Sequence, residues 1–498
     1  MQSLSQVQAR AAALVLPAHC VVDGQLVGAA DGAVFDNVTP RDGSILSRVP
    51  SCGAADVDRA VSAARAAFSD RRWRALAPAA RKKALLGLAE LMERDREDLA
   101  LMEALDTGKP ISDALNVDIP LAIGTTRWYG EALDKIYGEV GPNHSGKLSF
   151  AVHEPLGVVG AITPWNFPLH MAMWKVAPAL AMGNSVVLKP AEQSPLTAMR
   201  VAELALEAGI PPGVFNVVTG FGETAGQALS RHMDVDMIAF TGSGAVGRRL
   251  MIASGESNLK RVSLELGGKS PQIVFADCPD LDAAAQAAVW GIFYNQGEVC
   301  TAASRLLVQK EIKESFLARV IGIARAIEVG DPLDPATRFG AMVSKEQLET
   351  ATRYIAKGLA EGAELVLGGE RVRAESGGFY LEPTIFDNLT PASTLAREEV
   401  FGPVLGVLTF DDADEAIRIA NDTVFGLAAG LWTANIDVAM KVSRALHAGL
   451  VWVNGWDACD ITMPFGGFKQ SGFGRDRSLH ALHKYADLKS VTFTIRDA

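Results

Sequence analysis

The chain has 498 residues, of which 49% are hydrophobic and 21% are charged, and this composition predicts a soluble globular protein with two or three domains. The net charge of −11, without a basic stripe to offset it, argues against a nucleic-acid partner. No apolar stretch is long enough to span a membrane, and the run 11–16 is too short for a signal peptide. Five scattered cysteines without a Cys-x-x-Cys motif indicate a reducing compartment, so we expect a cytoplasmic protein without a disulfide framework or a zinc site.

The first part of the chain is predicted to contain a meander, two helical stretches and a hairpin. Turn dipeptides separate short β-rich pieces between residues 20 and 50. Helical spacing follows over 57–105 and again over about 113–134, and the segment 137–152 has hairpin character.

Strands and helices then alternate, which predicts a parallel sheet covered by helices on both faces. The alternation covers 155–260, with strands at 158–162, 185–188, 216–219 and 237–240 and helices at 171–182, 195–208, 224–230 and 245–253. It begins again after Glu265, with strands near 273–275 and 306–308 and helices near 281–293, 311–327 and 344–360. We therefore expect a second α/β domain from about residue 265, and a final strand at 490–495 that can pair with another chain.

Cys300 is the strongest candidate for a catalytic nucleophile. It follows a turn that contains Gly297 and precedes small residues. A thiol is mostly protonated at neutral pH and needs a nearby base to react. Glu265 stands in an apolar strand-like run directly before a Gly-Gly turn, where burial would raise its pKa and let it exchange protons near neutrality. A buried cysteine on its own is usually inert packing, so the hypothesis depends on the pair.

A glycine-rich turn predicts a dinucleotide site. The motif Gly242-Ser243-Gly244-Ala245-Val246-Gly247 follows a strand and opens a helix, the context in which backbone amides face a pyrophosphate. Such a motif alone is weak evidence. The acid normally expected to bind the ribose would be Glu265, which cannot also serve as a base. We favour Glu192, which follows the strand ending at Leu188.

Asn166 lies in the rigid loop Pro164-Trp165-Asn166-Phe167-Pro168. This loop either simply terminates a strand or presents the Asn166 amide to a developing oxyanion beside the Cys300 backbone N–H. On composition alone the two interpretations are equal. His480 and His483 could share a helix face, but no carboxylate or cysteine completes a ligand set, so we predict no metal.

Seven motifs in one order resemble the aldehyde dehydrogenase superfamily, and the similarity extends over about residues 20–495. They are the segments 164–168, 189–192, 240–243, 264–270, 295–300, 398–404 and 464–472. The resemblance implies an NAD-binding domain over 1–134 and 153–264, a catalytic domain over 265–475, and an oligomerisation segment over 135–152 and 476–498. It also implies a homodimer or homotetramer.

The resemblance further implies roles for individual residues. Cys300 is the nucleophile, Glu265 the base that hydrolyses a thioester, and Asn166 the oxyanion donor, while Lys175 with Asp476 could relay protons. The implied cofactor site contains Lys189 and Glu192 at the adenosine ribose, Gly242 and Ser243 at the pyrophosphate, and Glu399 and Phe401 at the nicotinamide, with Ile162, Trp165, Gly222 and Leu266 nearby. The Glu192 carboxylate favours NAD over NADP because it repels a 2′-phosphate, although Lys189 leaves NADP possible.

Together these observations predict oxidation of an aldehyde to a carboxylic acid through a thiohemiacetal and a thioester on Cys300. A catalytically silent structural protein would be expected to lose Cys300 or Glu265, and both are present. A thiol esterase or acyltransferase is another alternative, which ester cleavage without any cofactor reduction would favour.

The substrate is predicted from a loop that precedes the 464–472 motif. The loop is similar to that of the ω-aminoaldehyde branch, which acts on γ-aminobutyraldehyde-type products. Carboxylates and aromatic walls could attract a distal ammonium or guanidinium, or the acids could simply solvate the rim. Cys459 and Leu266 stand where these relatives carry smaller residues, which favours slimmer or uncharged aldehydes, so a broad aliphatic or aromatic aldehyde dehydrogenase stays an alternative. The candidate substrate residues are Asp118, Phe167, Trp174, Trp456, Asp457, Cys459, Asp460 and Phe465.

Overall fold

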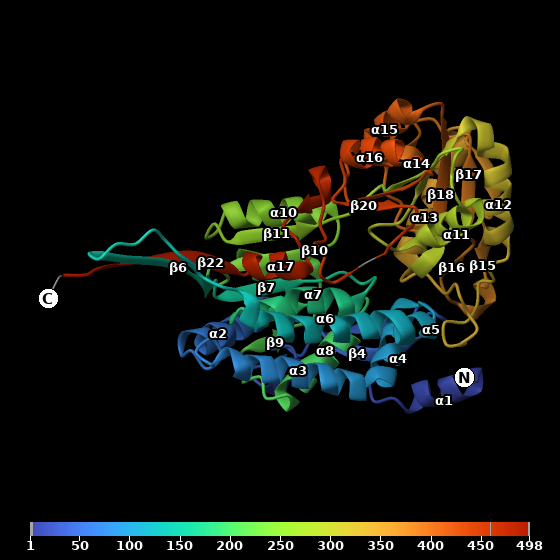
Figure 1. The fold of residues 1–498 in the computed structure, drawn as a ribbon. Coiled ribbons are helices and arrows are strands. Elements are labelled where there is room, and N and C mark those ends of the chain that lie inside the picture. Colours follow the sequence, from blue (N-terminus) through green and yellow to red (C-terminus); the bar gives the residue numbers. More distant parts are fainter. Residues whose placement is uncertain (1–2, 459, 497–498) are drawn as a thin grey trace.

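The computed structural model describes residues 3–458 and 460–496, which form two α/β units and a projecting arm (Figure 1). The first unit is built on an eight-stranded sheet with the order β2-β1-β9-β8-β7-β10-β11-β21. The strands β7, β8 and β10 are buried along their whole length, as expected for apolar strands of a parallel sheet covered on both faces. The sheet consists of β1 Cys20–Val22, β2 Gln25–Val27, β7 Val158–Ile162, β8 Ser185–Lys189, β9 Phe215–Val217, β10 Met237–Thr241, β11 Arg261–Glu265 and β21 Gly472–Phe473.

Helices pack against this sheet, and apolar side chains fill the space between the helices and the sheet. The stretch expected to be helical over 57–105 forms three helices, because Pro78 begins a new helix and a turn at Asp95 separates the next. The main helices are α1 Leu4–Ala13, α2 Ala54–Ser69, α3 Pro78–Arg94, α4 Arg96–Thr107, α6 Ile119–Ala132, α7 Pro168–Ala181, α8 Leu196–Glu207, α9 Gln227–Arg231, α10 Gly244–Gly255 and α17 Ser478–Lys484. The hairpin β3 Val34–Val38 and β4 Ile45–Pro50 lies outside the sheet.

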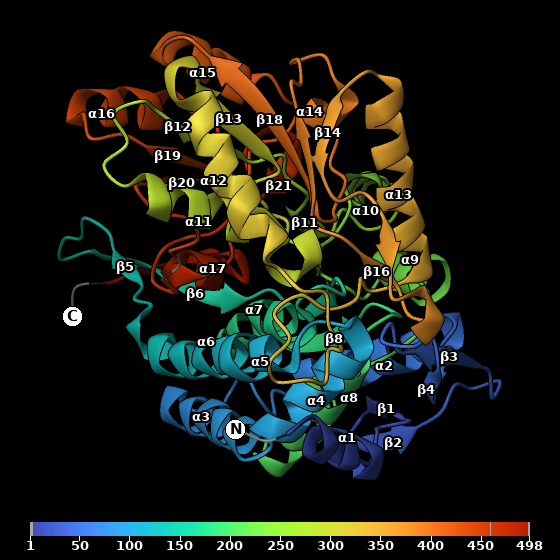
Figure 2. The same ribbon diagram turned by 90° about the vertical axis from the view of Figure 1, so that its right-hand side faces the viewer.

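The second unit has a seven-stranded sheet with the order β14-β17-β18-β13-β12-β19-β20. Figure 2 shows it with α12 and α13, beside the helical layer of the first unit. Its strands are β12 Pro271–Val274, β13 Arg305–Gln309, β14 Glu364–Leu367, β17 Thr384–Asp387, β18 Val404–Phe410, β19 Ala428–Trp432 and β20 Leu450–Val453. Its longer helices are α11 Leu281–Phe293, α12 Lys313–Arg325, α13 Lys345–Ala360, α15 Ala413–Asn421 and α16 Ile436–Ala445. These two sheets confirm the predicted α/β fold class.

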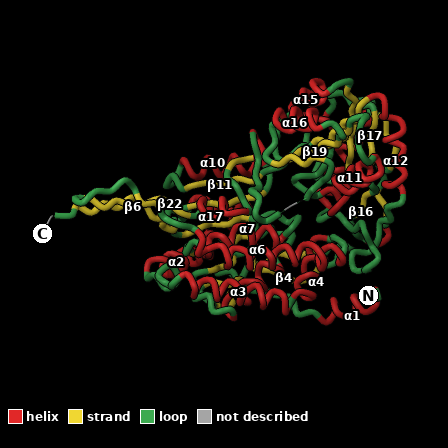
Figure 3. Tube along the Cα trace, viewed as in Figure 1, coloured by secondary structure: helices red, strands yellow, loops and turns green. Residues whose placement is uncertain are grey.

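The arm is a three-stranded sheet of β5 Glu139–Val140, β6 Lys147–Pro155 and β22 Ala486–Thr494. Figure 3 shows it as strands and loops that extend away from both units. The register places Ala486 opposite Pro155 and Thr494 opposite Lys147, so the predicted terminal strand pairs within its own chain along nine residues. No helix of the described residues is long and apolar enough to cross a membrane.

One segment that we expected in the second domain returns to the first sheet. The short strand β21 pairs with β11, so that Gly472 lies opposite Glu265. Gly472 has φ 108°, and a Cβ there would lie 2.1 Å from the Leu264 carbonyl oxygen, so only glycine fits this approach. The chain therefore closes over the strand end that carries Glu265.

Candidate active site

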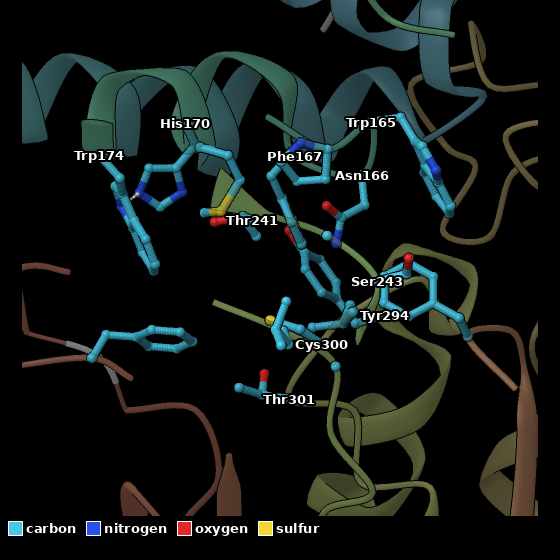
Figure 4. A pocket seen from close by; sticks show the side chains of 18 of the residues that line it. Trp165, Asn166, Phe167, His170, Trp174, Thr241, Ser243, Tyr294, Cys300 and Thr301 are labelled. Carbon is cyan, nitrogen blue, oxygen red and sulfur yellow. Dashed lines mark hydrogen bonds between the residues drawn. The ribbon is translucent and has the colours of Figure 1, made fainter. Parts of the chain in front are cut away.

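A cavity of about 340 Å³ lies between the two sheets and contains most of the predicted site residues. In Figure 4, Asn166, His170 and Trp174 extend from α7 and the loop before it, while Cys300 and Thr301 approach from the other side. Of the predicted residues, the lining includes Trp165, Asn166, Phe167, Trp174, Gly242, Ser243, Leu266, Cys300, Glu399, Phe401, Asp457 and Phe465. Residues separated by up to 300 positions in the chain thus share one space.

Cys300 is held by an unusual backbone. Asn295, Gln296 and Gly297 have consecutive positive φ values of 48°, 56° and 74°. A Cβ at Gly297 would lie 2.3 Å from the Gly402 carbonyl oxygen, so this turn requires glycine. Non-glycine residues in this region are strained, and such strain persists where the surrounding structure imposes it, often at functional sites.

The Cys300 thiol lies in a negative environment. Burial, then the charges of Glu399, Glu265 and Asp457, raise its pKa. Attack on a carbonyl therefore requires a group that takes the thiol proton, and the carboxylates that raise its pKa are candidates for that role.

Glu265 ends β11 and is buried, with 2% of its surface exposed. Neither carboxyl oxygen has a hydrogen-bond partner among the described residues. Burial first, and then the charge of Asp476, raise its pKa well above the usual value. A buried carboxyl group without a donor to stabilise its charge is a strong proton acceptor once ionised.

The Asn166 side chain is fixed at the N-terminus of α7. Its Nδ2 donates to the Glu298 carbonyl at 2.8 Å, which leaves its second N–H for another acceptor. Lys109 Nζ donates to the Asn166 carbonyl at 2.9 Å and lies 4.4 Å from the Phe167 ring centre. These contacts hold the amide in place at the cavity wall before a substrate binds.

Lys175 and Asp476 meet as predicted. Lys175 Nζ donates to Asp476 Oδ2 at 3.1 Å, and Lys484 donates to the other carboxylate oxygen. Lys175 and Asp476 are 1% and 0% exposed. The two ammonium groups oppose the effect of burial and lower the pKa of Asp476, so it stays ionised beside Glu265.

The Gly-rich turn takes the predicted form. Ser243 is the N-cap of α10, its side chain accepts from the Val246 N–H, and the helix begins directly at Gly244. The amides of this first turn point toward the open end, as an anion site requires. Gly222 lies apart from the cavity, at the start of a π-helical turn after β9.

Two further predicted carboxylates come from different units, Glu192 after β8 of the first and Glu399 before β18 of the second. Glu192 is one-third exposed and lies 3.3 Å from the buried Lys189 ammonium. Glu399 Oε1 accepts from the Gly268 N–H at 3.0 Å, and burial raises its pKa to about 7. A Cβ on Gly267 would lie 1.8 Å from Glu399, so the Gly-Gly turn is what admits this side chain.

The structure corrects two substrate residues. Asp118 is completely buried and forms an ion pair with Lys109, which also lies 3.5 Å from Glu103. It does not line the cavity, because its side chain is buried against the Lys109 ammonium. Asp460 is exposed and accepts from the Thr462 N–H at 2.8 Å, outside the cavity. Cys459 lies outside the described residues.

A second, outer chamber of about 410 Å³ contains residues that the sequence analysis missed. It shares Val117, Tyr294, Val299, Thr301 and Asp457 with the inner cavity, and it adds Asp113, Trp290, Arg338 and the predicted Trp456. Trp290 could have been found from its position ten residues before Cys300. Asp113 ends the helical turn α5 Ile111–Asp113 and Arg338 lies in a loop of the second unit, and no local pattern relates them to the site.

Comparisons with known proteins agree with this geometry. A model described as the aldehyde dehydrogenase family matches residues 27–491. The chain is 48% identical, over 98% of both sequences, to the NADP/NAD-dependent aldehyde dehydrogenase PuuC of Escherichia coli. It resembles the crystal structure of an indole-3-acetaldehyde dehydrogenase with NAD+, with a TM-score of 0.98 and 55% identity over 99% of this chain and 100% of that one. The γ-glutamyl-γ-aminobutyraldehyde dehydrogenase of Burkholderia cenocepacia gives a TM-score of 0.98 and 54% identity with the same coverage.

Proposed function

Because the chain belongs to the aldehyde dehydrogenase family, we propose that its cavity oxidises ω-amino or guanidino aldehydes. It is an oxidoreductase that converts aldehydes to carboxylic acids, with NAD as its cofactor. The observation that carries the proposed substrate class is the outer chamber, which joins acidic side chains and indole rings to the space around Cys300.

The residues present fit a dinucleotide. The α10 N-terminus offers amides to a pyrophosphate, and Glu192 and Glu399 are carboxylates placed to accept from ribose hydroxyls. Trp165 and Phe401 meet edge to face, with ring centres 5.2 Å apart, at the wall between these groups and Cys300. When bound, NAD supplies the hydride acceptor.

Each protein residue then has a defined task. The Cys300 sulfur forms a bond with the carbonyl carbon, its proton passes to a carboxylate in the cavity, and the free N–H of Asn166 donates to the oxygen that becomes negative. Loss of hydride leaves a thioester on Cys300. Glu265 removes a proton from the water that attacks this thioester, and the carboxylic acid leaves as the thiol re-forms.

The substrate chain is proposed to extend from Cys300 past Tyr294 into the outer chamber. Its apolar part contacts aromatic side chains, and its distal cation faces Asp113 and Asp457 near Trp456, because the Arg338 guanidinium of the same chamber already lies 5.3 Å from the Trp290 ring centre. The Burkholderia relative is named for a γ-glutamyl-γ-aminobutyraldehyde, which supports an aldehyde with a nitrogen along its chain.

An aryl-substituted aldehyde is the second candidate. The inner cavity has aromatic walls, since Trp174 and Phe465 meet with ring centres 4.8 Å apart and Phe167 lies nearby. The indole-3-acetaldehyde dehydrogenase among the similar structures is named for such a substrate.

Kinetics can decide between these substrates. The panel is 4-aminobutanal, 4-guanidinobutanal, hexanal, benzaldehyde and indole-3-acetaldehyde, measured by cofactor reduction. We expect the amino or guanidino substrate to have the highest kcat/KM, and Asp113→Asn to lower it while Asp460→Asn does not. A higher kcat/KM for hexanal or an aryl aldehyde would reject the amino-substrate proposal. Loss of all cofactor reduction in Cys300→Ala, with intact folding, tests the nucleophile separately.

The arm is proposed to join copies of the chain into a dimer or tetramer. Leu148, Leu488 and Phe493 are large apolar side chains exposed on β6 and β22. Deletion of 487–498 should lower the oligomer mass measured by light scattering. Four described cysteines are free thiols, which supports the proposed cytoplasmic location.

A further inference from the structure

A buried arginine that lines the inner cavity has no ionic partner among the described residues. Arg477 is 5% exposed, and no described residue accepts a hydrogen bond from its guanidinium or forms an ion pair with it. Its Nε is fully enclosed and unsatisfied. Buried cations are normally paired and hydrogen-bonded, because an unpaired charge loses its hydration without gaining a partner. An arginine kept in this position therefore requires an explanation.

The backbone directs this side chain inward at a cost. Arg477 has φ 61° and ψ 177°, and Ser478 has φ 51°. Non-glycine residues rarely adopt such angles, which are strained and persist only where the surrounding structure imposes them. Paired backbone hydrogen bonds of 2.8 Å between Phe465 and Asp476, and a bond of 2.7 Å from the Ser478 N–H to the Ile461 carbonyl, hold this conformation. The strain is thus imposed by neighbours on both sides of Arg477.

Aromatic rings hold the guanidinium at the wall of the cavity. Its Cζ lies 5.2 Å from the Trp174 ring centre and 5.9 Å from that of Phe465. Stacking on these faces orients the plane but uses none of the N–H donors. The nearby titratable groups are His170, whose pKa is lowered to about 3 so that it stays neutral, the exposed Asp460, and Asp457 of the cavity lining.

We propose that Arg477 is a specificity-determining residue that binds an oxygen acceptor on the substrate chain, either a carboxylate or an amide carbonyl. This inference rests on the proposed oxidation of aldehydes at Cys300 and deepens it. A fixed guanidinium repels a free ammonium at this depth and donates to oxygen, in bidentate fashion where the acceptor is a carboxylate. The preferred aldehyde therefore carries an acyl or carboxyl oxygen along its chain, and any cationic group lies farther out, in the outer chamber.

The test compares wild type with Arg477→Met on four aldehydes of similar length. These are 4-acetamidobutanal, 5-oxopentanoate, 4-aminobutanal and hexanal, and the first two distinguish an amide from a carboxylate. Hydrogen bonds to charged groups contribute about 1.5–3 kcal/mol, so we expect kcat/KM for the acceptor-bearing substrate to fall roughly 10-fold to 150-fold. The value for hexanal should change little, and the value for 4-aminobutanal should stay level or rise.

Two more variants separate recognition from folding. Arg475→Met removes the same charge two residues earlier, where the side chain donates to the Gly467 and Gly474 carbonyls outside the cavity, and it should leave the substrate ranking unchanged. Arg477→Lys should restore part of the activity toward 5-oxopentanoate through charge alone. If Arg477→Met lowers kcat/KM for hexanal as much as kcat/KM for the oxygenated substrates, the residue only packs against the cavity wall and the inference is wrong. A wild-type enzyme that reduces no cofactor with any aldehyde would instead reject the proposed function.

Discussion

Two buried carboxyl groups beside the cavity, Glu265 and Asp476, have pKa values that are shifted in opposite directions, although both lie in a region of low dielectric constant. Glu265 has no hydrogen-bond donor for either oxygen among the described residues, and its pKa is raised. Asp476 is equally buried, but it accepts from Lys175 and Lys484, and its pKa is lowered. Burial alone favours the neutral acid, whereas two ammonium groups preserve the anion. The unpaired group is therefore suited to moving a proton, and the paired group to holding a charge in place.

Removal of the titratable group at Glu265 should cause the largest loss of activity among these predictions. Glu265→Gln keeps the shape and abolishes base catalysis, so thioester hydrolysis should slow by about 10³-fold, or about 4 kcal/mol. Formation of the thioester should persist. Stopped-flow measurement of reduced cofactor should thus show a rapid burst followed by a slow steady state. A slow first turnover without a burst would mean that Glu265 acts before hydrolysis.

The pH dependence of thioester hydrolysis tests the raised pKa of Glu265 directly. Because Glu265 must be ionised to accept a proton and its pKa is raised, the hydrolysis rate should rise as the pH increases through that elevated value. The rise should disappear in Glu265→Gln. A wild-type rate that is already flat across neutral and alkaline pH would contradict a raised pKa in the working enzyme.

Asp476→Asn should mainly reduce stability. It leaves Lys175 and Lys484 without their anion in a buried site, and breaking such a pair costs about 3 kcal/mol. The folded-state pKa of Asp476 lies below the unfolded value, so its stabilisation is present above the unfolded pKa and is lost as the pH falls through the folded one. The difference in free energy of unfolding between wild type and variant should therefore shrink in acid.

A surface pair provides the control for this variant. Arg231 and Glu256 lie 2.8 Å apart with about half of each side chain exposed, and Glu256→Gln should cost under about 1 kcal/mol. Urea unfolding of both variants at several pH values would measure the contrast. Equal losses in the free energy of unfolding would show that Asp476 does not stabilise the two buried lysines.

The local sequence was enough to predict those site residues that lie at the end of a single strand or within a single turn. Glu265, Asn166 and Ser243 each lie where a strand meets a turn or helix, so the local pattern was enough to propose them as site residues. Asp118 was misplaced because its carboxylate is buried in an ion pair with Lys109, a contact formed across the π-helical turn Ala114–Asp118 that the sequence pattern did not predict.

Other features depend on long-range packing. The outer chamber takes residues from four segments between Asp113 and Trp456, and only the folded chain brings them together. The sequence pattern did not single out Arg477. Its orientation follows from a strained backbone that is fixed by segments more than ten residues away. Strain and missing partners are properties of the fold and leave no pattern in the neighbouring residues.

The smallest predicted effect belongs to a third carboxylate, Glu192, which is intermediate between the two buried ones. It is one-third exposed and has one lysine, Lys189, at 3.3 Å, while Lys189 Nζ also donates to the Pro190 carbonyl at 2.8 Å. Glu192→Ala should remove both the acceptor for the ribose hydroxyls and the repulsion of a 2′-phosphate. The NAD to NADP ratio of kcat/KM should then fall by about 10-fold, or about 1.4 kcal/mol. The exposed Glu223 is the matched control, because Glu223→Ala removes a charge near the same strand ends and should keep the ratio. An unchanged ratio in Glu192→Ala would show that Lys189 already neutralises this carboxylate, and that a single ion pair at the surface of a site does not set cofactor choice.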